Sequence, residues 1–495
     1  MAPKQHDGLD IYGGSLALLT DLYQLTMACG YWKAGDSERE AVFHLTYRRP
    51  PFGGGYAIAA GIEPALAFLR RFQFTDDDVA YCKTLVDARG DQLFPDAFLA
   101  YLREMKFSCT VDAVPEGSLV FPHEPILRVK GPILQAQLVE TALLDIVNFQ
   151  TLIATKAARV VQAARGAPVL EFGLRRAQGI DGGISASRAA YIGGCYGTSN
   201  VLAGKLLGIP VRGTHAHSWV MFHGDELAAF RAYADAMPGN CTFLVDTYDT
   251  LHGVANAITV GRELRANGYE LGGIRLDSGD LAFLSAEARR MLDAAGFPDA
   301  KVVASNDLDE QTIASLFEQG AKIDVFGVGT RLVTAFDQPA LGGVYKLGAC
   351  RDEAGVWQES IKLSEQPIKI SNPGVLQVRR LRHGNELVGD IIYDSEHGLA
   401  GQALHDIEDP TRLPWTPAFD ASEDLLVTRI AHGEDVGEAP TLLAARERAA
   451  AELAQLSVRT RRFLNPQPFA VGLDSHVHAR KQELIAKARI QGGRS

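Results

Sequence analysis

Short runs of hydrophobic residues recur along the middle of the chain, and each is followed by a polar or glycine-rich loop. Six runs lie between residues 168 and 330: PVLEFG (168–173), IPVRGT (209–214), CTFLVDTY (241–248), GGIRLDSGD (272–280), KVVASND (301–307) and IDVFGVGT (323–330). They are apolar on both faces, as buried parallel strands are. Stretches with helical periodicity separate most of them, at 226–237, 251–268, 281–296 and 308–320. Strands alternating with helices predict a parallel α/β sheet, and six such units predict an irregular β/α barrel.

The two ends of the chain follow a different pattern. Near the start we expect a helix over 16–35, a strand over 41–52, strand segments over 118–132 and a long helix over 132–166. After residue 346, apolar alternation predicts strands over 358–394, and a helix is expected over 440–463. The predicted parts are therefore an N-terminal α/β part at 1–150, the barrel at 151–345, and a C-terminal part at 346–495. The first and last parts are expected to pack together as a second α/β body.

Polar side chains gather where the predicted strands end: Arg175, Thr214, His217, Asp246, Arg275, Asp277, Asn306 and Thr330. In a β/α barrel the active site lies at the carboxyl ends of the strands, and an open doubly wound sheet uses the same ends. The clustering therefore indicates a site without deciding whether the sheet closes into a barrel.

The segment GTHAHSWVM (213–221) carries the sharpest local signal, because it places His215 and His217 directly after a short strand. A histidine in such a position can act as a general base, a metal ligand or a phosphate acceptor. The cysteines or carboxylates expected of a zinc site are not apparent nearby. A second pair, His476 and His478, could also bind a metal, although the sequence around it offers no further ligand.

Several other segments suit anions. Arg175 and Arg176 follow a strand, and arginine pairs well with phosphate oxygens. The turn GGCYGTSNVLAGKLLG (193–208) opens a helix whose amides could attract phosphate. The segment DVFGVGTRL (324–332) places Gly327, Gly329 and Thr330 at a strand end, but it matches neither the Walker pattern nor a dinucleotide fingerprint.

Arg275, Asp277 and Asp280 follow one another in IRLDSGDL (274–281). The arginine could hold an anion, and the carboxylates could hold ribose hydroxyls or Mg²⁺. Asp280 could equally cap the next helix. Tyr23, on the predicted N-terminal helix, could belong to the core or stack on a heteroaromatic ring.

Composition narrows the class of protein. The formal charge is −11, which disfavours general nucleic-acid binding. No apolar run approaches the ~20 residues needed to cross a bilayer, and MAPKQHDGLD has no apolar core of a secretory signal. The six cysteines include no CxxC pair, which favours a reducing cytoplasm.

Taken together, the motifs resemble the nicotinate phosphoribosyltransferase family. The resemblance runs from Thr20 to about Leu347 through TDLYQLTM, YRRPPFGGGYAIAAG, EFGLRRAQGIDGG, GTSNVLAGK, GTHAHSWVM, VDTYDT, GIRLDSGDL, SNDLDE and GVGTRLVTAFDQPALGGVYKL. It implies an irregular barrel of the type II phosphoribosyltransferase kind with a second α/β body. It also implies a homodimer whose sites lie near the subunit interface. The last ~150 residues match less clearly.

The resemblance also implies residue roles. His217 matches the histidine that ATP phosphorylates in that family, whereas His215 occupies a variable position and receives no role. The implied nicotinate-binding residues are Tyr23, Thr214 and Arg275. Arg175, Gly329 and Thr330 are the implied contacts of 5-phosphoribosyl 1-pyrophosphate. Asp277 is an implied catalytic partner of the ribose or of Mg²⁺, and the full set of magnesium ligands stays unknown.

The implied reaction joins nicotinate to 5-phosphoribosyl 1-pyrophosphate and hydrolyses ATP, with Mg²⁺ as cofactor. Nicotinamide phosphoribosyltransferase is the nearest alternative, with quinolinate phosphoribosyltransferase behind it. GTHAHS and TDLYQ favour the nicotinate enzyme, and a neutral amide gives less reason for an arginine at position 275. A non-catalytic metabolite-binding protein on the same scaffold is an alternative from another class.

Overall fold

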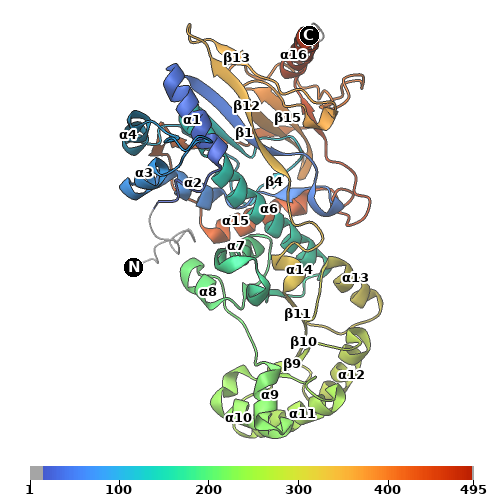
Figure 1. The fold of residues 1–495 in the computed structure, drawn as a ribbon. Coiled ribbons are helices and arrows are strands. Elements are labelled where there is room, and N and C mark those ends of the chain that lie inside the picture. Colours follow the sequence, from blue (N-terminus) through green and yellow to red (C-terminus); the bar gives the residue numbers. More distant parts are fainter. Residues whose placement is uncertain (1–14, 493–495) are drawn as a thin grey trace. The chain divides into compact units, whose positions relative to one another are not determined.

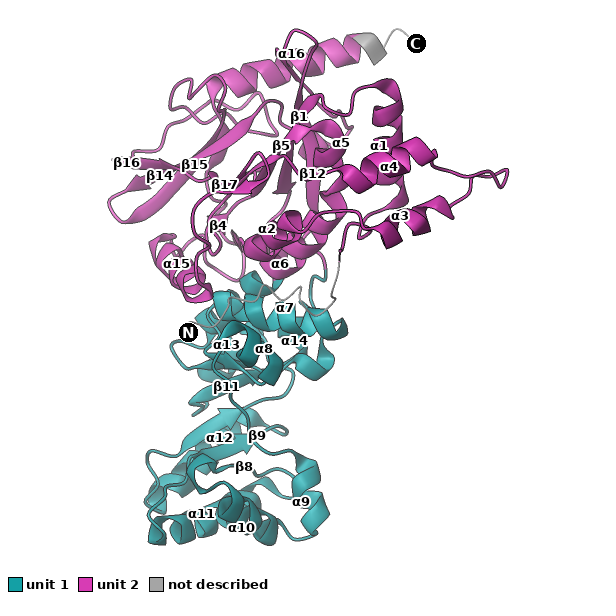
Figure 2. Ribbon diagram, turned by 90° about the vertical axis from the view of Figure 1, so that its left-hand side faces the viewer, with its two compact units in different colours: residues 1, 3, 153–339 teal, residues 2, 4–152, 340–495 magenta. Residues whose placement is uncertain are grey.

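The computed structural model describes residues 15–492, which form two compact units of mixed α/β structure. Unit 1 covers 153–339, and unit 2 joins 15–152 to 340–492 (Figure 2). The chain passes from unit 2 into unit 1 within helix α6 (Glu140–Ala163) and returns after Pro339. No helix among the described residues is both long and apolar enough to span a bilayer.

Unit 1 is built on a six-stranded parallel sheet in the order β7-β6-β11-β10-β9-β8. Its strands are β6 (Val169–Glu171), β7 (Gly197–Thr198), β8 (Thr242–Leu244), β9 (Gly273–Leu276), β10 (Lys301–Ala304) and β11 (Val325–Val328). Its helices are α7 (Gly179–Ile192), α8 (Val201–Leu207), α9 (His217–His223), α10 (Glu226–Ala236), α11 (Thr250–Ala266), α12 (Leu281–Ala294), α13 (Glu310–Glu318) and α14 (Thr330–Val333) (Figure 1).

This strand order is the chain order taken around a ring, as in a β/α barrel. The predicted strand at 209–214 contributes only one parallel bridge, from Val211 to Thr198 beside β7. Pro210 has no N–H to donate to a ladder, which explains why the strand stays so short. Among residues 15–492, no strand pairing joins this segment to β8. The mixed α/β class is confirmed, whereas closure into a barrel is not and stays a prediction.

Unit 2 holds a seven-stranded sheet in the order β13-β12-β1-β5-β3-β17-β18. Its strands are β1 (Glu40–Tyr47), β3 (Thr110–Ala113), β5 (Leu127–Pro132), β12 (Gly343–Arg351), β13 (Trp357–Glu359), β17 (Val427–Ala431) and β18 (Glu434–Asp435). The antiparallel pairs β1–β12 and β3–β17 bring early and late segments of the chain into this one sheet.

A second sheet of unit 2 has the order β16-β14-β15-β19, and β2 pairs with β4. These strands are β2 (Ala57–Ile58), β4 (Leu119–Val120), β14 (Leu376–His383), β15 (Glu386–Asp394), β16 (Ala421–Asp424) and β19 (Val471–Leu473). The remaining α-helices are α1 (Leu22–Ala34), α2 (Ile62–Arg70), α3 (Asp76–Lys83), α4 (Asp96–Glu104), α5 (Ile133–Leu138), α15 (Leu442–Gln455) and α16 (Ser475–Gly492). The strand alternation predicted across 358–394 is interrupted between Glu359 and Leu376, where only a short 3₁₀ turn at Pro367–Lys369 forms.

Local sequence explains where the long predicted helix at 132–166 breaks. It divides into α5 and α6 at Val139. The carbonyl of Gln137 accepts from the side chain of Gln24, and the side chain of Gln137 donates to the carbonyl of Gln24, both at 2.9 Å. This reciprocal pair links α5 to α1 and uses a carbonyl that a continuous helix would need for its own ladder.

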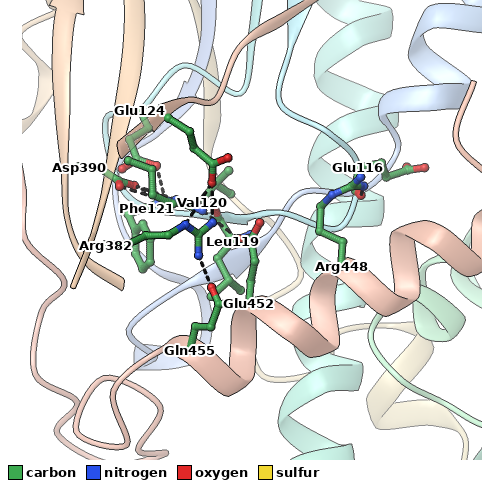
Figure 3. A network of polar contacts seen from close by, with 12 residues as sticks. Glu116, Leu119, Val120, Phe121, Glu124, Arg382, Asp390, Arg448, Glu452 and Gln455 are labelled. Carbon is green, nitrogen blue, oxygen red and sulfur yellow. Dashed lines mark hydrogen bonds and ion pairs between the residues drawn. The ribbon is translucent and has the colours of Figure 1, made fainter. Parts of the chain in front are cut away.

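A buried arginine joins the C-terminal strands and α15 to the N-terminal half of unit 2. The side chain of Arg380 has no solvent exposure. It lies 2.7 Å from Asp390 on β15 and 2.8 Å from Glu452 on α15, and it donates to the carbonyl of Leu119 at 2.8 Å. Burial, followed by the Asp390 carboxylate, raises the pKa of Glu124 well above its usual range, so that Glu124 is held neutral beside this network (Figure 3).

Replacing Arg380 with Met should therefore destabilise unit 2 strongly. Removing one partner of a buried ion pair leaves the carboxylates uncompensated, at a cost of about 3–5 kcal/mol. The neighbouring Arg379 pairs with Asp424 at the surface, so that Arg379→Met should cost at most about 1 kcal/mol. Denaturant unfolding followed by circular dichroism compares the two, and equal losses would contradict the assignment.

Candidate active site

The guanidinium of Arg275 joins three loops at the carboxyl end of the unit 1 sheet. Its Nε donates to Ser305 Oγ after β10 at 2.8 Å, and its two terminal nitrogens donate to Thr214 Oγ1 at 3.1 Å and to Asp277 Oδ1 at 3.0 Å. Because the donors of a guanidinium lie in a fixed plane, these bonds set the relative positions of Thr214, Asp277 and Ser305.

Asp246, just beyond β8, anchors the next loop. Its side chain is 1% exposed. Its Oδ2 accepts from the backbone N–H of Asp277 at 2.9 Å and from Ser278 Oγ at 2.6 Å. Its Oδ1 is buried and makes no hydrogen bond within the described part of the chain. A buried carboxylate oxygen without a partner is costly, so a cation or a donor is expected to meet it when substrate is bound.

His217, the first residue of α9, lies beside these carboxylates. Its Nδ1 is 3.1 Å from Thr247 Oγ1. Its Nε2 is 3.8 Å from Asp277 Oδ2 and 3.9 Å from Asp246 Oδ1, which is too long for direct hydrogen bonds. The side chain is 39% exposed, so an incoming phosphoryl group could reach the imidazole.

His215 has a structural role. Its Nε2 accepts from the backbone N–H of Leu244 on β8 at 3.1 Å, and its ring lies among Phe230, Tyr233 and Phe243. Burial is the main cause that lowers its pKa, and the positive charge of Arg275 contributes. A neutral His215 therefore links the loop before α9 to β8, where no backbone ladder forms.

A pocket of about 290 Å³ opens at this edge of the sheet. Its lining consists of Phe172, Leu174, Arg175, Ser199, Gly213, Thr214, His215, Ala216 and Arg275. The guanidinium of Arg275 lies 5.6 Å from the centre of the Phe172 ring. The lining therefore combines two arginines and a flat aromatic face with no acidic side chain, which suits a small planar anion.

The glycine at 327 makes room for that aromatic residue. A Cβ atom at Gly327 would lie 2.6 Å from the Phe172 ring, and one at Gly329 would lie 3.2 Å from the Phe172 carbonyl oxygen.

Gly329 caps α14 and Thr330 begins it. Arg175 lies exposed in a 3₁₀ turn after β6. Within residues 15–492, no hydrogen bond or ion pair connects Thr330 to the Arg275 network.

Backbone strain marks the same edge of the sheet. Asn306 and Asp307, directly after Ser305, have φ values of 100° and 39°. Residues other than glycine rarely adopt positive φ, and such strain persists where surrounding structure enforces it, often at functional sites. The loop after β10 is therefore held in a specific conformation beside the Arg275 network.

Tyr23 belongs to unit 2, where it lies on α1 with 49% of its surface exposed. Partial burial and the carboxylates of Glu140 and Asp21 raise the pKa of its phenol. Its role in binding nicotinate stays a prediction. Of the other predicted residues, Arg275, Asp277 and Thr214 form one hydrogen-bonded network, and Arg175 lies on the wall of the adjoining pocket. His217 Nε2 lies 3.8 Å from Asp277 Oδ2, beside this network.

Three supporting residues were not singled out from the sequence. Thr247 follows Asp246 in VDTYDT, Ser305 begins SNDLDE, and Phe172 precedes the glycine of EFGLRR. Each lies within three residues of a strand end, which is the signal that could have identified them. Asp280, by contrast, caps α12 by accepting from the N–H of Phe283.

The fold and this site define an α/β protein with an arginine-lined pocket at the carboxyl ends of parallel strands. Models of the nicotinate phosphoribosyltransferase N-terminal domain, family and C-terminal domain match residues 18–148, 168–353 and 377–481. The chain therefore belongs to the nicotinate phosphoribosyltransferase family.

Individual proteins and solved structures are also similar to this chain. A nicotinate phosphoribosyltransferase of Bacillus subtilis is 50% identical over 404 residues, which cover 81% of this chain and 79% of the relative. A human nicotinate phosphoribosyltransferase is 38% identical, covering 95% of this chain and 96% of its own. The crystal structure of human nicotinic acid phosphoribosyltransferase superposes with a TM-score of 0.82 at 34% identity, covering 94% of this chain and 99% of that one. A nicotinate-nucleotide pyrophosphorylase of Pyrococcus furiosus shares the fold, with a TM-score of 0.66 at 22% identity over 89% of this chain and 95% of its own.

Proposed function

We propose that the protein is an ATP-coupled nicotinate phosphoribosyltransferase of NAD salvage, acting through a phosphohistidine at residue 217. The observation that carries this proposal is the Arg275 network, which joins an anion pocket to an accessible imidazole flanked by two anchored carboxylates. The three family matches and the relatives named above support it. We further propose a cytoplasmic homodimer, from the cysteine usage and the family resemblance.

The pocket favours a carboxylate over an amide. Arg275 lies at its wall beside Phe172, and the lining contains no acidic side chain that could accept from an amide NH₂. In the proposed complex the pyridine ring lies against Phe172, with Tyr23 as the predicted second aromatic contact, and its carboxylate pairs with Arg275. Thr214, already bonded to Arg275, is positioned to donate to the same carboxylate.

The transfer step needs no proton removal from the nucleophile. The lone pair of the pyridine nitrogen forms a bond to the anomeric carbon of the ribose, and the bond from that carbon to pyrophosphate breaks with its electrons leaving on oxygen. Positive charge develops on the sugar in the transition state, and the carboxylate of Asp277 would stabilise it. Arg175 and the loop at Gly329 and Thr330 would hold the phosphate groups.

The carboxylates also fit a divalent cation. The unpartnered Oδ1 of Asp246 and the Oδ2 of Asp277 both lie within 3.9 Å of the same imidazole nitrogen. No group of three metal-binding side chains occurs among the described residues. Mg²⁺ usually takes one or two protein carboxylates and completes its shell with water and substrate phosphates. When bound here it would neutralise phosphate charge, and Asp246 and Asp277 are the residues that would hold it.

In the coupling step, an imidazole nitrogen of His217 bonds to the γ-phosphorus of ATP, and ADP leaves with the electrons of the broken P–O bond. The phosphohistidine adds a charge of about −2 beside the sugar site. Hydrolysis then transfers the phosphoryl group to water and restores the imidazole.

The direct test is product formation by the purified protein with nicotinate, 5-phosphoribosyl 1-pyrophosphate and Mg²⁺, with and without ATP. We expect nicotinate mononucleotide, with faster turnover in the presence of ATP and a strong preference for nicotinate over nicotinamide. Intact-mass measurement after ATP should show one acid-labile phosphate. Preferential use of nicotinamide would favour the alternative enzyme, and no product from either pyridine would refute the proposal.

Replacing His217 with Ala should abolish ATP hydrolysis linked to turnover and leave slow, uncoupled transfer, because the phosphoryl acceptor is lost while the pyridine pocket remains. The ratio of ADP to nicotinate mononucleotide measures the coupling. His223→Ala, on the same helix, is the matched control and should keep the ratio of the unmodified protein. Coupling that survives in the His217 variant would show the assignment to be wrong.

Replacing Arg275 with Gln should raise KM for nicotinate by about 10- to 100-fold, since a charge-assisted hydrogen bond contributes about 1.5–3 kcal/mol. The variant also disturbs Asp277, so the diagnostic quantity is the ratio of kcat/KM for nicotinate to that for nicotinamide. That ratio should fall with Arg275→Gln. Arg175→Gln, as a control, should raise KM for 5-phosphoribosyl 1-pyrophosphate and leave the ratio unchanged.

A further inference from the structure

Four of the chain's thirteen histidines form two stacked pairs at the start of α16. His476 stacks on His397 with ring centres 4.2 Å apart and planes inclined by 27°. His478 stacks on His405 at 4.5 Å and 19°. The sequence left a metal site at His476 and His478 possible but offered no further ligand for it. Instead, each ring meets another imidazole face to face, and no group of three metal-binding side chains occurs within residues 15–492.

The partners of both rings lie on one stretch, residues 397–407, which we call the clamp segment. Its backbone is also bound to the start of α16. His405 exchanges two hydrogen bonds with Leu473, at 2.8 and 2.9 Å. The N–H of Ala400 donates to Asp474, the residue before α16, at 2.9 Å, and the same carboxylate accepts from the N–H of Val477.

Few negative charges face the stacked rings. Asp394, at the end of β15, lies 3.7 Å from His397 Nδ1. Asp474 is already engaged by the two backbone N–H groups. On the other stack, His405 Nε2 lies 3.3 Å from the hydroxyl of Ser475. The buried Lys481 donates to Asn372 and to the carbonyl of Ile407, and so adds positive charge beside His478.

The remaining charged neighbours lie along the clamp segment and just beyond it. Asp406 pairs with Arg412 at 2.8 Å, and Glu408 pairs with His123 at 3.2 Å. Arg412 and His123 therefore partly neutralise these two carboxylates outside the stacks. His476 Nε2 is buried without a hydrogen-bond partner among the described residues.

Each stack places two imidazoles face to face at the first turn of α16. Two imidazolium rings in contact repel each other, and the N-terminus of a helix carries a partial positive charge that disfavours cations in its first turn. Burial, followed by His405 and Lys481, lowers the pKa of His478. Its neutral form therefore stabilises the folded chain fully above about pH 6.5, the ordinary imidazole value, and this stabilisation is lost as the pH falls through the lower folded value.

We propose that the two histidine stacks are an acid-sensitive clamp, which holds the clamp segment on α16 at neutral pH and releases it when a stack takes up its second proton. Release of the clamp segment would change a cavity that the segment lines. Asp406 and Ile407, with the adjoining Glu408 and Asp409, line a cavity of about 610 Å³ that Arg48, Arg49 and His123 also line. Acidification therefore opens and reshapes this cavity of unit 2 without unfolding the surrounding sheets.

Hydrogen–deuterium exchange of the full chain at pH 7.5 and pH 5.5, corrected for intrinsic exchange, tests the clamp. Peptides from the clamp segment and from the first two turns of α16 should exchange faster at pH 5.5 than at pH 7.5, because the clamp is released there. Peptides from β14 and β15 should keep their rates. Equal corrected rates for the clamp segment at both pH values would overturn the proposal.

Two variants separate the histidines from general acid effects. His476→Phe with His478→Phe keeps a ring in each stack and removes one of the two charges, so acid should no longer accelerate exchange. His397→Phe with His405→Phe should give the same result from the other side, and serves if the first pair folds poorly. His383→Phe, an exposed histidine on β14, is the control and should respond like the unmodified chain. Acid-accelerated exchange that persists in either double variant would refute the clamp.

Discussion

The geometry of the candidate site depends on the three hydrogen bonds that the guanidinium of Arg275 donates. Arg275 is bonded at once to Ser305, Thr214 and Asp277, which come from three separate loops of unit 1. Asp277 in turn receives its orientation from Asp246, and both carboxylates face His217. Short parallel strands of three or four residues would define these loop positions loosely. The planar fork of Arg275 supplies the missing precision, because its donors cannot move independently.

Much of this arrangement was readable from sequence. Parallel strands put their carboxyl ends on one edge, so Thr214, His217, Arg275 and Asp277 were expected together. The structure bonds Arg275 to Thr214 and Asp277 and places His217 3.8 Å from Asp277. The roles given to these residues stay predictions, as do those of Tyr23 and Thr330. The sequence could not reveal which side chains serve to position another side chain. Asp246 resembles its polar neighbours in sequence, yet only its burial and its bonds to Asp277 and Ser278 distinguish it as an anchor.

In the fold, too, some features could be predicted from the sequence and others could not. Apolar runs predicted β6, β8, β9, β10 and β11, since burial on both faces leaves a direct trace in composition. The run at 209–214 was misleading because Pro210 limits its pairing to Val211. The break between α5 and α6 depends on Gln24, over a hundred positions away along the chain, and local periodicity carries no record of such a contact. Likewise His476 and His478 appeared as an adjacent pair, whereas their true partners, His397 and His405, lie about 75 residues earlier.

The buried Arg380 has a consequence for how this chain can vary. Its guanidinium is matched to Asp390, Glu452 and a main-chain carbonyl, while Glu124 completes the group in its uncharged form. No single replacement of Arg380, Asp390 or Glu452 preserves both volume and charge balance. Tolerated change at this place therefore has to be concerted, with arginine and acids exchanged for apolar residues in one step. Few single mutations at this buried ion-pair group are therefore tolerated. A recombinant that combines N- and C-terminal halves from divergent relatives must inherit the whole group from compatible parents.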